Sequence, residues 1–481
     1  MTVTLTTRHD ITLEALHRVA WQGEDVRLHA YAIARMTSER QRFMALIDDP
    51  AISVYGVTSG YGQNARKRLS PDERKTHAKR PPIQQAAAWG DLLPERVVRA
   101  IILARLANFI DGHSAITPEV AVAVAHMLDG GPLPEIPARG QGGAGEILSL
   151  SHAFGALART SPVAEKDVLS LINGSPAAAA LVADTALAAD RRLSVAIEVF
   201  ALAAEAFNTP RGHFSAELGG LWNNPHDAWA LAQLGLAIGN GHDGPRRPYQ
   251  APVSFRILPR MLGQARRAER IAAEIATESL AAVTDNPVML PPDDGHRLGR
   301  IISTGGYHNP HAVMAMDAVV AANINLITIA GRFCAKLLDG SVSLLPDQLG
   351  LGGLPGYMGC LPMAVVGYEE EARLNGVATL LPGSESGGFG QDDVASPVFL
   401  AWTKQERTGN LLEASLASLA FVALRAMDFT KCPIPPRLEG LAGLIRQFLP
   451  ATDSETVLGP AVAQLEAVLR LRVYGPGMPR H

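Results

Sequence analysis

Cysteine and aromatic residues are scarce in this chain. It has three cysteines in 481 residues, and aromatic residues make up 5% of it. The cysteines, Cys334, Cys360 and Cys432, lie far apart and form neither a CxxC pair nor a Cys/His ligand spacing. A disulfide framework and a zinc site are therefore not expected, and we predict no bound metal ion.

The sequence also lacks an excess of charge of one sign. It has 43 Lys and Arg residues against 47 Asp and Glu residues, a formal net charge of -4. Because nucleic acids bind to extended basic faces, we expect no nucleic-acid partner. The first residues, MTVTLTTRHD, do not have the regions of a leader, and no uninterrupted apolar run of about 18 residues is found. We therefore expect a cytoplasmic protein with no membrane partner.

What the chain does have is apolar helical sequence. It is 47% hydrophobic and 19% charged, which is typical of a globular protein with a large core. Apolar residues recur at i, i+3, i+4 and i+7 through five long stretches: 95–128, 177–207, 262–283, 311–338 and 398–428. Alternating runs are rare, and the best strand candidates are the segments 52–55 and 299–303. The sequence predicts an all-α fold.

The loops between these helices are rich in glycine, which is favoured where the backbone must turn sharply or approach a ligand closely. These loops are 54–62, 129–146, 239–249, 303–311, 350–360 and 382–393. We expect the polar residues of these loops to carry the chemistry. A loosely placed boundary near residue 205 separates a loop-rich helical region, 1–205, from a central and C-terminal helical bundle, 206–481.

Two of the glycine-rich segments carry a resemblance to a known family. Residues 54–62 read VYGVTSGYG, and residues 137–152 read PARGQGGAGEILSLSH. They resemble the YGxNTGFG and PxxGSVGASGDLAPLAH segments of the histidine and aromatic amino-acid ammonia-lyases. The resemblance implies that Tyr55 is the general base that removes the β-proton of the substrate. A tyrosine acts in this way only if its surroundings lower its pKa from about 10, and taken alone Tyr55 could simply pack at the end of a strand.

The second segment departs from the family pattern at one residue. In the family, the serine of an Ala-Ser-Gly triplet forms the methylidene-imidazolone (MIO) electrophile, and here one residue is missing between Ala144 and Gly145. Shifting the alignment pairs the family's serine with Ala144, which also has no hydroxyl. We therefore expect no prosthetic group at the degenerate position Gly143, Ala144 and Gly145.

Five further segments follow in the family's order. Residues 165–175 resemble the KExLALxNGT stretch, which implies that Asn173 contacts the substrate, although it could instead cap a helix. Residues 250–263 resemble QDxYSLRCxPQVxG, which implies that Arg256 anchors the substrate carboxylate. The family's second catalytic tyrosine aligns with Val253.

The remaining three segments lie between residues 281 and 393. Residues 281–287, AAVTDNP, resemble NSxTDNP, and their Asp-Asn-Pro end is typical of a turn. Residues 304–309, TGGYHN, resemble GGNFHG and keep His308 as a substrate-binding residue. Residues 391–393 resemble the QED motif, which implies that Gln391 binds the substrate and that Asp392 lies close to its amine.

The resemblance leaves several functions open. Without the electrophile, either the leaving group is already good or the reaction is a different one. Ergothionases resemble these lyases, lack the prosthetic group and release trimethylamine from a betaine. The corresponding interpretation here is an MIO-independent carbon–nitrogen lyase acting on a small-molecule substrate by β-elimination. The groups expected to face its cation are Glu146 or the pair Asp392 and Asp393, with Trp89 or Trp402.

A different class of function is a catalytically inactive relative that acts as a binding or partner subunit. A third is another elimination or addition on a small acid. Retention of Tyr55, Asn173 and Arg256 favours an active site. By resemblance we also expect long antiparallel helices in a central bundle and a homotetramer with active sites shared between chains.

Overall fold

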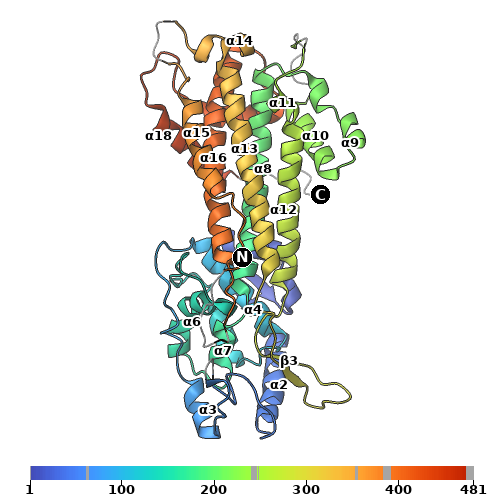
Figure 1. Cartoon of the computed structure of the whole chain (residues 1–481), viewed down its shortest axis with the longest axis vertical. Helices are drawn as coiled ribbons and strands as arrows, with labels where there is room; N and C mark the ends of the chain where they lie inside the picture. The colour runs from blue at the N-terminus through green and yellow to red at the C-terminus, as the bar shows by residue number, and fades with distance from the viewer. Residues whose placement is uncertain are drawn as a thin grey trace. The chain divides into compact units, whose positions relative to one another are not determined.

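The chain in this computed structural model is built almost entirely from helices joined by glycine-rich loops (Figure 1). The structure describes residues 2–60, 64–239, 246–247, 249–352, 356–382, 390 and 392–472. The all-helical prediction is confirmed. Among the described residues, strands are confined to two short pairs, and only the second of the two expected strand segments forms one.

The contacts of the chain divide it into two units, each assembled from separate stretches of sequence. The first contains residues 1–187, 272–316 and 379–403, and the second contains residues 188–271, 317–378 and 404–481. This division differs from the single boundary near residue 205 expected from the sequence. The chain passes between the units five times, and four of these crossings lie inside long helices, where composition gives no sign of a boundary.

Four long helices have residues in both units: α8 (Pro176–Ala206), α12 (Leu258–Leu280), α13 (Pro310–Leu338) and α16 (Val398–Thr430). The expected helix at 95–128 is two helices in the structure, separated at Gly112, whose φ of 84° ends the first.

The first unit also holds shorter elements, in which β1 pairs with β2 in parallel and β3 pairs with β4 in antiparallel fashion. These elements are β1 (Thr2–Leu5), η1 (Arg8–Asp10), α1 (Leu13–Leu16), η2 (His17–Trp21), β2 (Asp25–Leu28), α2 (Ala30–Ile47), α3 (Pro71–Ala78), α4 (Glu95–Ile110), α5 (Pro118–His126), η4 (Ala144–Glu146), α6 (Ile147–Thr160), α7 (Asp167–Ile172), β3 (Val288–Leu290) and β4 (Arg300–Ile302).

The second unit is a helical bundle. Its further elements are η5 (Arg211–Phe214), α9 (Glu217–Trp222), α10 (Pro225–Ile238), α11 (Val253–Arg256), α14 (Gly340–Ser343), η6 (Asp347–Leu349), α15 (Leu361–Leu374), η8 (Pro436–Leu438), α17 (Glu439–Arg446) and α18 (Leu458–Leu471). In its core the ring of Phe333 stacks on that of Phe255 and meets that of Phe200 edge to face. In this bundle side chains of α13 hydrogen-bond to side chains of α12, α15 and α16.

Three helical stretches are apolar enough, by length and composition alone, to cross a membrane: Asp167–Ala206, Pro310–Leu338 and Val398–Thr430. The most apolar windows of these stretches are 94%, 61% and 89% buried inside the protein, respectively. None is an uninterrupted apolar run, because polar residues such as Asp184, Asn323 and Gln405 lie within them. Burial in the protein itself accounts for their apolar character.

Candidate active site

Tyr55 lies on a tight turn and not at the end of a strand. The carbonyl oxygen of Val54 accepts hydrogen bonds from the backbone N–H groups of residues 57, 58 and 59, and Thr58 Oγ1 accepts one from Val54 N at 2.7 Å. Gly56, with a φ of 67°, allows the chain to reverse here. Because Val54 is anchored in a buried apolar cluster with Phe43 and Met289, the half-buried Tyr55 is carried on a rigid support.

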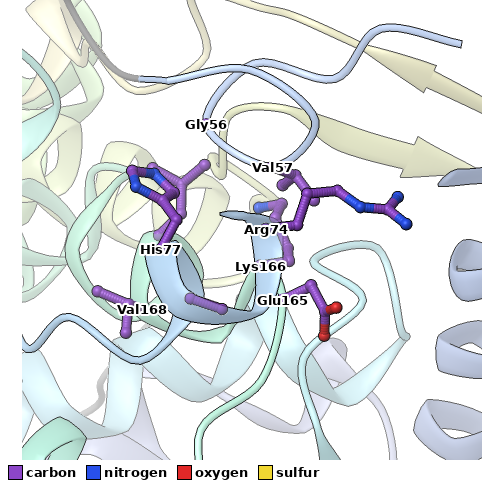
Figure 2. Close-up of a pocket in the computed structure, with 9 residues that line it drawn as sticks. Gly56, Val57, Arg74, His77, Glu165, Lys166 and Val168 are labelled. Atoms are coloured by element: carbon purple, nitrogen blue, oxygen red, sulfur yellow. The ribbon is translucent and has the colours of Figure 1, made fainter. Parts of the chain in front are cut away.

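A small cavity lies directly beside this turn, between residues 56–57, helix α3 and residues 165–169 (Figure 2). It contains about 210 Å3 of empty space, including solvent at its mouth. Because this volume includes open solvent, the enclosed space is far smaller than the roughly 300–1,000 Å3 of a ligand site, and the cavity alone cannot hold a substrate. In Figure 2 the Arg74 guanidinium reaches away from the His77 ring, and its Nη1 donates to the carbonyl oxygen of Ile47 at 2.6 Å. Burial lowers the pKa of His77, and the nearby Arg80 lowers it further.

The degenerate junction Gly143, Ala144 and Gly145 is packed tightly in the same unit. The carbonyl oxygen of Gly145 accepts a hydrogen bond from Gly174 N at 3.2 Å, and that of Gly143 accepts one from Ser396 N at 3.3 Å. A Cβ atom added to Gly145, whose φ is 64°, would lie 3.3 Å from Asn173 Oδ1. The structure therefore places the Asn173 side chain next to the junction.

Glu146, the residue after the junction, accepts hydrogen bonds from the start of helix α8. Its carboxylate oxygens accept hydrogen bonds from Ala177 N at 2.6 Å and Ala178 N at 2.8 Å, and the residue is 5% exposed. Burial raises the pKa of Glu146 to about 8, and the bonds from Ala178 and Ala177 and the charge of Arg105 oppose this rise. Because both oxygens are engaged by backbone donors that a helix start would otherwise leave unpaired, we assign Glu146 a structural role in place of the expected catalytic one.

Behind the junction lies a cluster of buried charges that the sequence had not singled out. Lys166 Nζ donates to Asp285 Oδ2 at 2.8 Å, and Arg105 Nη2 lies 3.9 Å from Asp285 Oδ1. Arg105 Nη1 donates to the carbonyl oxygen of Asn173 at 2.5 Å. Burial lowers the pKa of Arg105 to about 10, against the charges of Asp285 and Glu146. Asp285 is thus a buried counter-ion, in addition to the turn role expected for it.

The sequence did contain a signal for this cluster. Arg105 and Asn108 interrupt the apolar run of helix α4, where a charged or amide side chain must find a buried partner. Asn108 Oδ1 accepts hydrogen bonds from Thr284 N at 2.7 Å and Asp285 N at 3.0 Å. The two polar residues of α4 therefore hold the segment around Asp285.

Two of the remaining predicted residues, His308 and Asp392, contact or belong to the segment that reaches the junction. His308 Nε2 is 3.4 Å from the carbonyl oxygen of Ala395, and the next residue, Ser396, contacts Gly143. Asp392 is half-buried on the same segment, and burial, followed by the charge of Asp393, raises its pKa. Gln391 lies outside the described residues.

Arg256 belongs to the second unit, in helix α11. Its Nε donates to the carbonyl oxygen of Ala251 at 3.1 Å, and the residue is partly exposed. None of the ion pairs found among the described residues involves Arg256, so its charge is not neutralised by a carboxylate of that part of the chain. The described residues also contain no group of three or more His, Cys, Asp or Glu side chains that could hold a metal ion.

Solved structures of similar fold cover almost all of the chain. Ergothionase from Treponema denticola, in complex with desmethyl-ergothioneine sulfonic acid, is 20% identical with a TM-score of 0.86, covering 98% of this chain and 99% of that one. Tyrosine aminomutase from Streptomyces globisporus is 23% identical with a TM-score of 0.85, covering 98% and 97%. At these identities the likeness shows the fold alone.

The sequence comparisons show the family. The chain is 26% identical to histidine ammonia-lyase of Vibrio cholerae, covering 98% of this chain and 96% of that protein. It is 27% identical to histidine ammonia-lyase of Streptomyces coelicolor, covering 98% and 92%. The sequence model of the aromatic amino acid lyase family matches residues 11–164 and 158–447. The membership that the motifs predicted is confirmed, and the chain belongs to the aromatic amino acid lyase family.

Proposed function

We propose that this protein is a carbon–nitrogen lyase that works without the MIO group and eliminates an amine that is already a good leaving group. The observation that carries the proposal is the chemistry of the loop at the junction. Residues 140–148, GQGGAGEIL, contain no serine, threonine or cysteine, so no hydroxyl or thiol is present there to be lost as an exocyclic methylene forms. The first hydroxyl after the junction, Ser149 Oγ, is buried and donates to the carbonyl oxygen of Glu146 at 3.0 Å. These residues do not fit the family's prosthetic group.

The absence of an electrophile restricts the substrate. Ammonia leaves poorly unless its nitrogen is alkylated or protonated, whereas a quaternary trimethylammonium group leaves as neutral trimethylamine. We therefore propose a betaine of an aromatic or imidazole amino acid as the substrate, of which ergothioneine is one example. This substrate class agrees with the fold shared with ergothionase, a protein whose solved complex holds an ergothioneine analogue.

In the proposed reaction, the Tyr55 phenolate takes the β-proton, the electrons of the C–H bond form the carbon–carbon double bond, and the C–N bond breaks. The products are an acrylate and trimethylamine, and the proton remains on Tyr55. Arg256, whose charge has no carboxylate partner among the described residues, anchors the substrate carboxylate by a paired guanidinium contact.

Asp392 is the acid that faces the cationic amine in this proposal. It lies on the segment that contacts both His308 and Gly143, whereas the carboxylate of Glu146 is held by helix α8. Asn173, His308 and Gln391 bind the substrate around it. From the family resemblance we also propose a homotetramer with active sites shared between chains, in the cytoplasm.

Two measurements test the function. The first incubates the purified protein with histidine, tyrosine, phenylalanine, ergothioneine and histidine betaine, and follows acrylate absorbance and amine release. We expect trimethylamine from a betaine, and loss of this release in Tyr55→Phe. Ammonia from a plain amino acid would contradict the proposal, and binding without turnover across the panel would favour an inactive binding subunit.

The second measurement tests the prosthetic group independently of activity. Trypsin cleaves after Arg139 and Arg159, which releases the junction as the peptide Gly140–Arg159. We expect its unmodified mass. A mass lower by the loss of water would show that the loop cyclises and would overturn the MIO-independent mechanism.

A further inference from the structure

Arg105 is a guanidinium buried at an unusual energetic cost. It is 0% exposed in helix α4, and among the residues that the structure describes its Nε and Nη2 have no hydrogen-bond partner. Within the same residues its one hydrogen bond is the contact from Nη1 to the carbonyl oxygen of Asn173 at 2.5 Å. Burying a charged group is costly unless it is paired and hydrogen-bonded, so a residue of this kind calls for a specific role.

The need to neutralise the charge of Asp285 does not explain why Arg105 is buried. Lys166 already pairs with Asp285 at 2.8 Å, and Ser170 Oγ donates to the same carboxylate at 3.1 Å. The guanidinium of Arg105 lies farther away, at 3.9 Å. The short contact of Arg105 is with the backbone of Asn173 and not with the acid.

The backbone around Asn173 is closely fitted to this guanidinium. Gly174 has a φ of 135°, and a Cβ atom there would lie 2.7 Å from Arg105 Nη1. On the following residue, Ser175 N donates to Thr284 Oγ1 at 2.9 Å. The turn that ends helix α7 is therefore held from two sides, by Arg105 and by Thr284.

The side chain of Asn173 is directed by this turn. Asn173 is 7% exposed, and its Oδ1 is buried at the Gly145 junction with no hydrogen-bond partner in the described part of the chain. An unpaired buried acceptor is costly, and it persists only when the surrounding structure fixes its direction. The contact from Arg105 to the Asn173 carbonyl supplies that constraint.

We propose that Arg105 is a positioning residue, which holds the Asn173 backbone so that the Asn173 side chain remains directed at the junction, where it binds the substrate. This inference rests on the proposed function, because it assigns Asn173 to the substrate. Arg105 itself does not touch the substrate.

The test uses Arg105→Lys and a matched control, Arg99→Lys. Arg99 lies on the same helix, is 4% exposed and also donates to backbone carbonyls, those of Val19, Glu24 and Leu128. Each variant is made in the wild-type and the Asn173→Ala backgrounds, and kcat and KM are measured with the substrate that the wild type turns over. A double-mutant cycle of this kind isolates the coupling between the two residues.

We expect Arg105→Lys to lower kcat by about 10- to 100-fold in the wild-type background, since small misplacements of catalytic geometry have effects of this order. In the Asn173→Ala background the same substitution should change kcat by less than about 3-fold. Arg99→Lys should have a similarly small effect in both. Equal losses for Arg105→Lys in the two backgrounds would overturn the proposal.

A second readout does not depend on activity. Hydrogen exchange of the backbone amides at residues 173–175 should be faster in Arg105→Lys than in Arg99→Lys, because the turn loses its anchor. If Arg105→Lys does not fold, Gly174→Ala displaces the guanidinium from the other side and should give the same local increase. Unchanged exchange at these amides would refute the positioning role. A wild type inactive on the whole panel, with this exchange difference present, would instead refute the proposed function alone.

Discussion

The assignment of Glu146 as a structural residue predicts that Glu146→Gln destabilises the fold. The two oxygens of Glu146 accept from Ala177 N and Ala178 N at 2.6 and 2.8 Å. An amide keeps one acceptor oxygen, but its NH2 group cannot accept a hydrogen bond and would face a buried backbone N–H. This holds whether or not the carboxyl is protonated. One lost bond and one unpaired donor should cost about 2 kcal/mol.

The assay is equilibrium urea unfolding followed by circular dichroism, with turnover measured on the folded protein. Asp392→Asn is the matched control, because Asp392 is half-buried and lies on the segment next to His308. We expect Glu146→Gln to lower the unfolding midpoint and to keep much of the activity. We expect Asp392→Asn to keep the unfolding midpoint and to lose most of the activity. An unchanged midpoint with abolished turnover in Glu146→Gln would show that Glu146 is the catalytic acid after all.

Two further predictions concern buried carboxyl groups. Asp285→Asn leaves the charge of Lys166 without its partner at 2.8 Å and should lower the free energy of unfolding by about 3–5 kcal/mol. In urea titrations the double variant Lys166→Met, Asp285→Asn should lose less stability than the sum of the two single variants. Losses in the free energy of unfolding that simply add would contradict the pairing. Burial raises the pKa of Glu269 from 4.5 to about 7, and the charge of Arg266 opposes this rise. As pH rises, the Glu269 carboxyl therefore ionises in the unfolded chain before it does so in the folded one, and the free energy of unfolding falls between about pH 4.5 and 7. Glu269→Gln should make this fall shallower by up to about 1.4 kcal/mol per pH unit. If the free energy of unfolding of variant and wild type changes with pH in parallel, Glu269 does not cause the fall.

The long helices could be predicted from the sequence because burial of one face imposes a period that the sequence itself records. The break in the stretch 95–128 was missed, since the apolar period continues on both sides of Gly112 and only the backbone φ reveals the turn. The segment 52–55 alternates as a strand does. Its residues instead satisfy their backbone groups within a turn around Val54.

The candidate site could be predicted only in part. Family motifs implied that Asn173 belongs to the site, and the structure places its side chain next to Gly145, while its contact with a substrate stays a prediction. The sequence also suggested an active carboxylate at Glu146. It could not reveal that the partners of this carboxylate are backbone amides some thirty positions away, because backbone donors leave no trace in the amino-acid letters. Arg105 was overlooked for a related reason, since its hydrogen-bond partner is also a main-chain atom.

The hydrogen bonds from helix α8 to Glu146 also fix the length of the loop that precedes Glu146. Successive Cα atoms are about 3.8 Å apart, so a serine inserted after Ala144 would push Glu146 off the first turn of α8 or force the loop to bulge against Asn173. Replacing Ala144 by serine, in contrast, leaves the spacing to Glu146 intact. A laboratory attempt to place a serine at the junction would thus succeed more readily by substitution than by insertion, which must displace Glu146 from helix α8 or deform the loop.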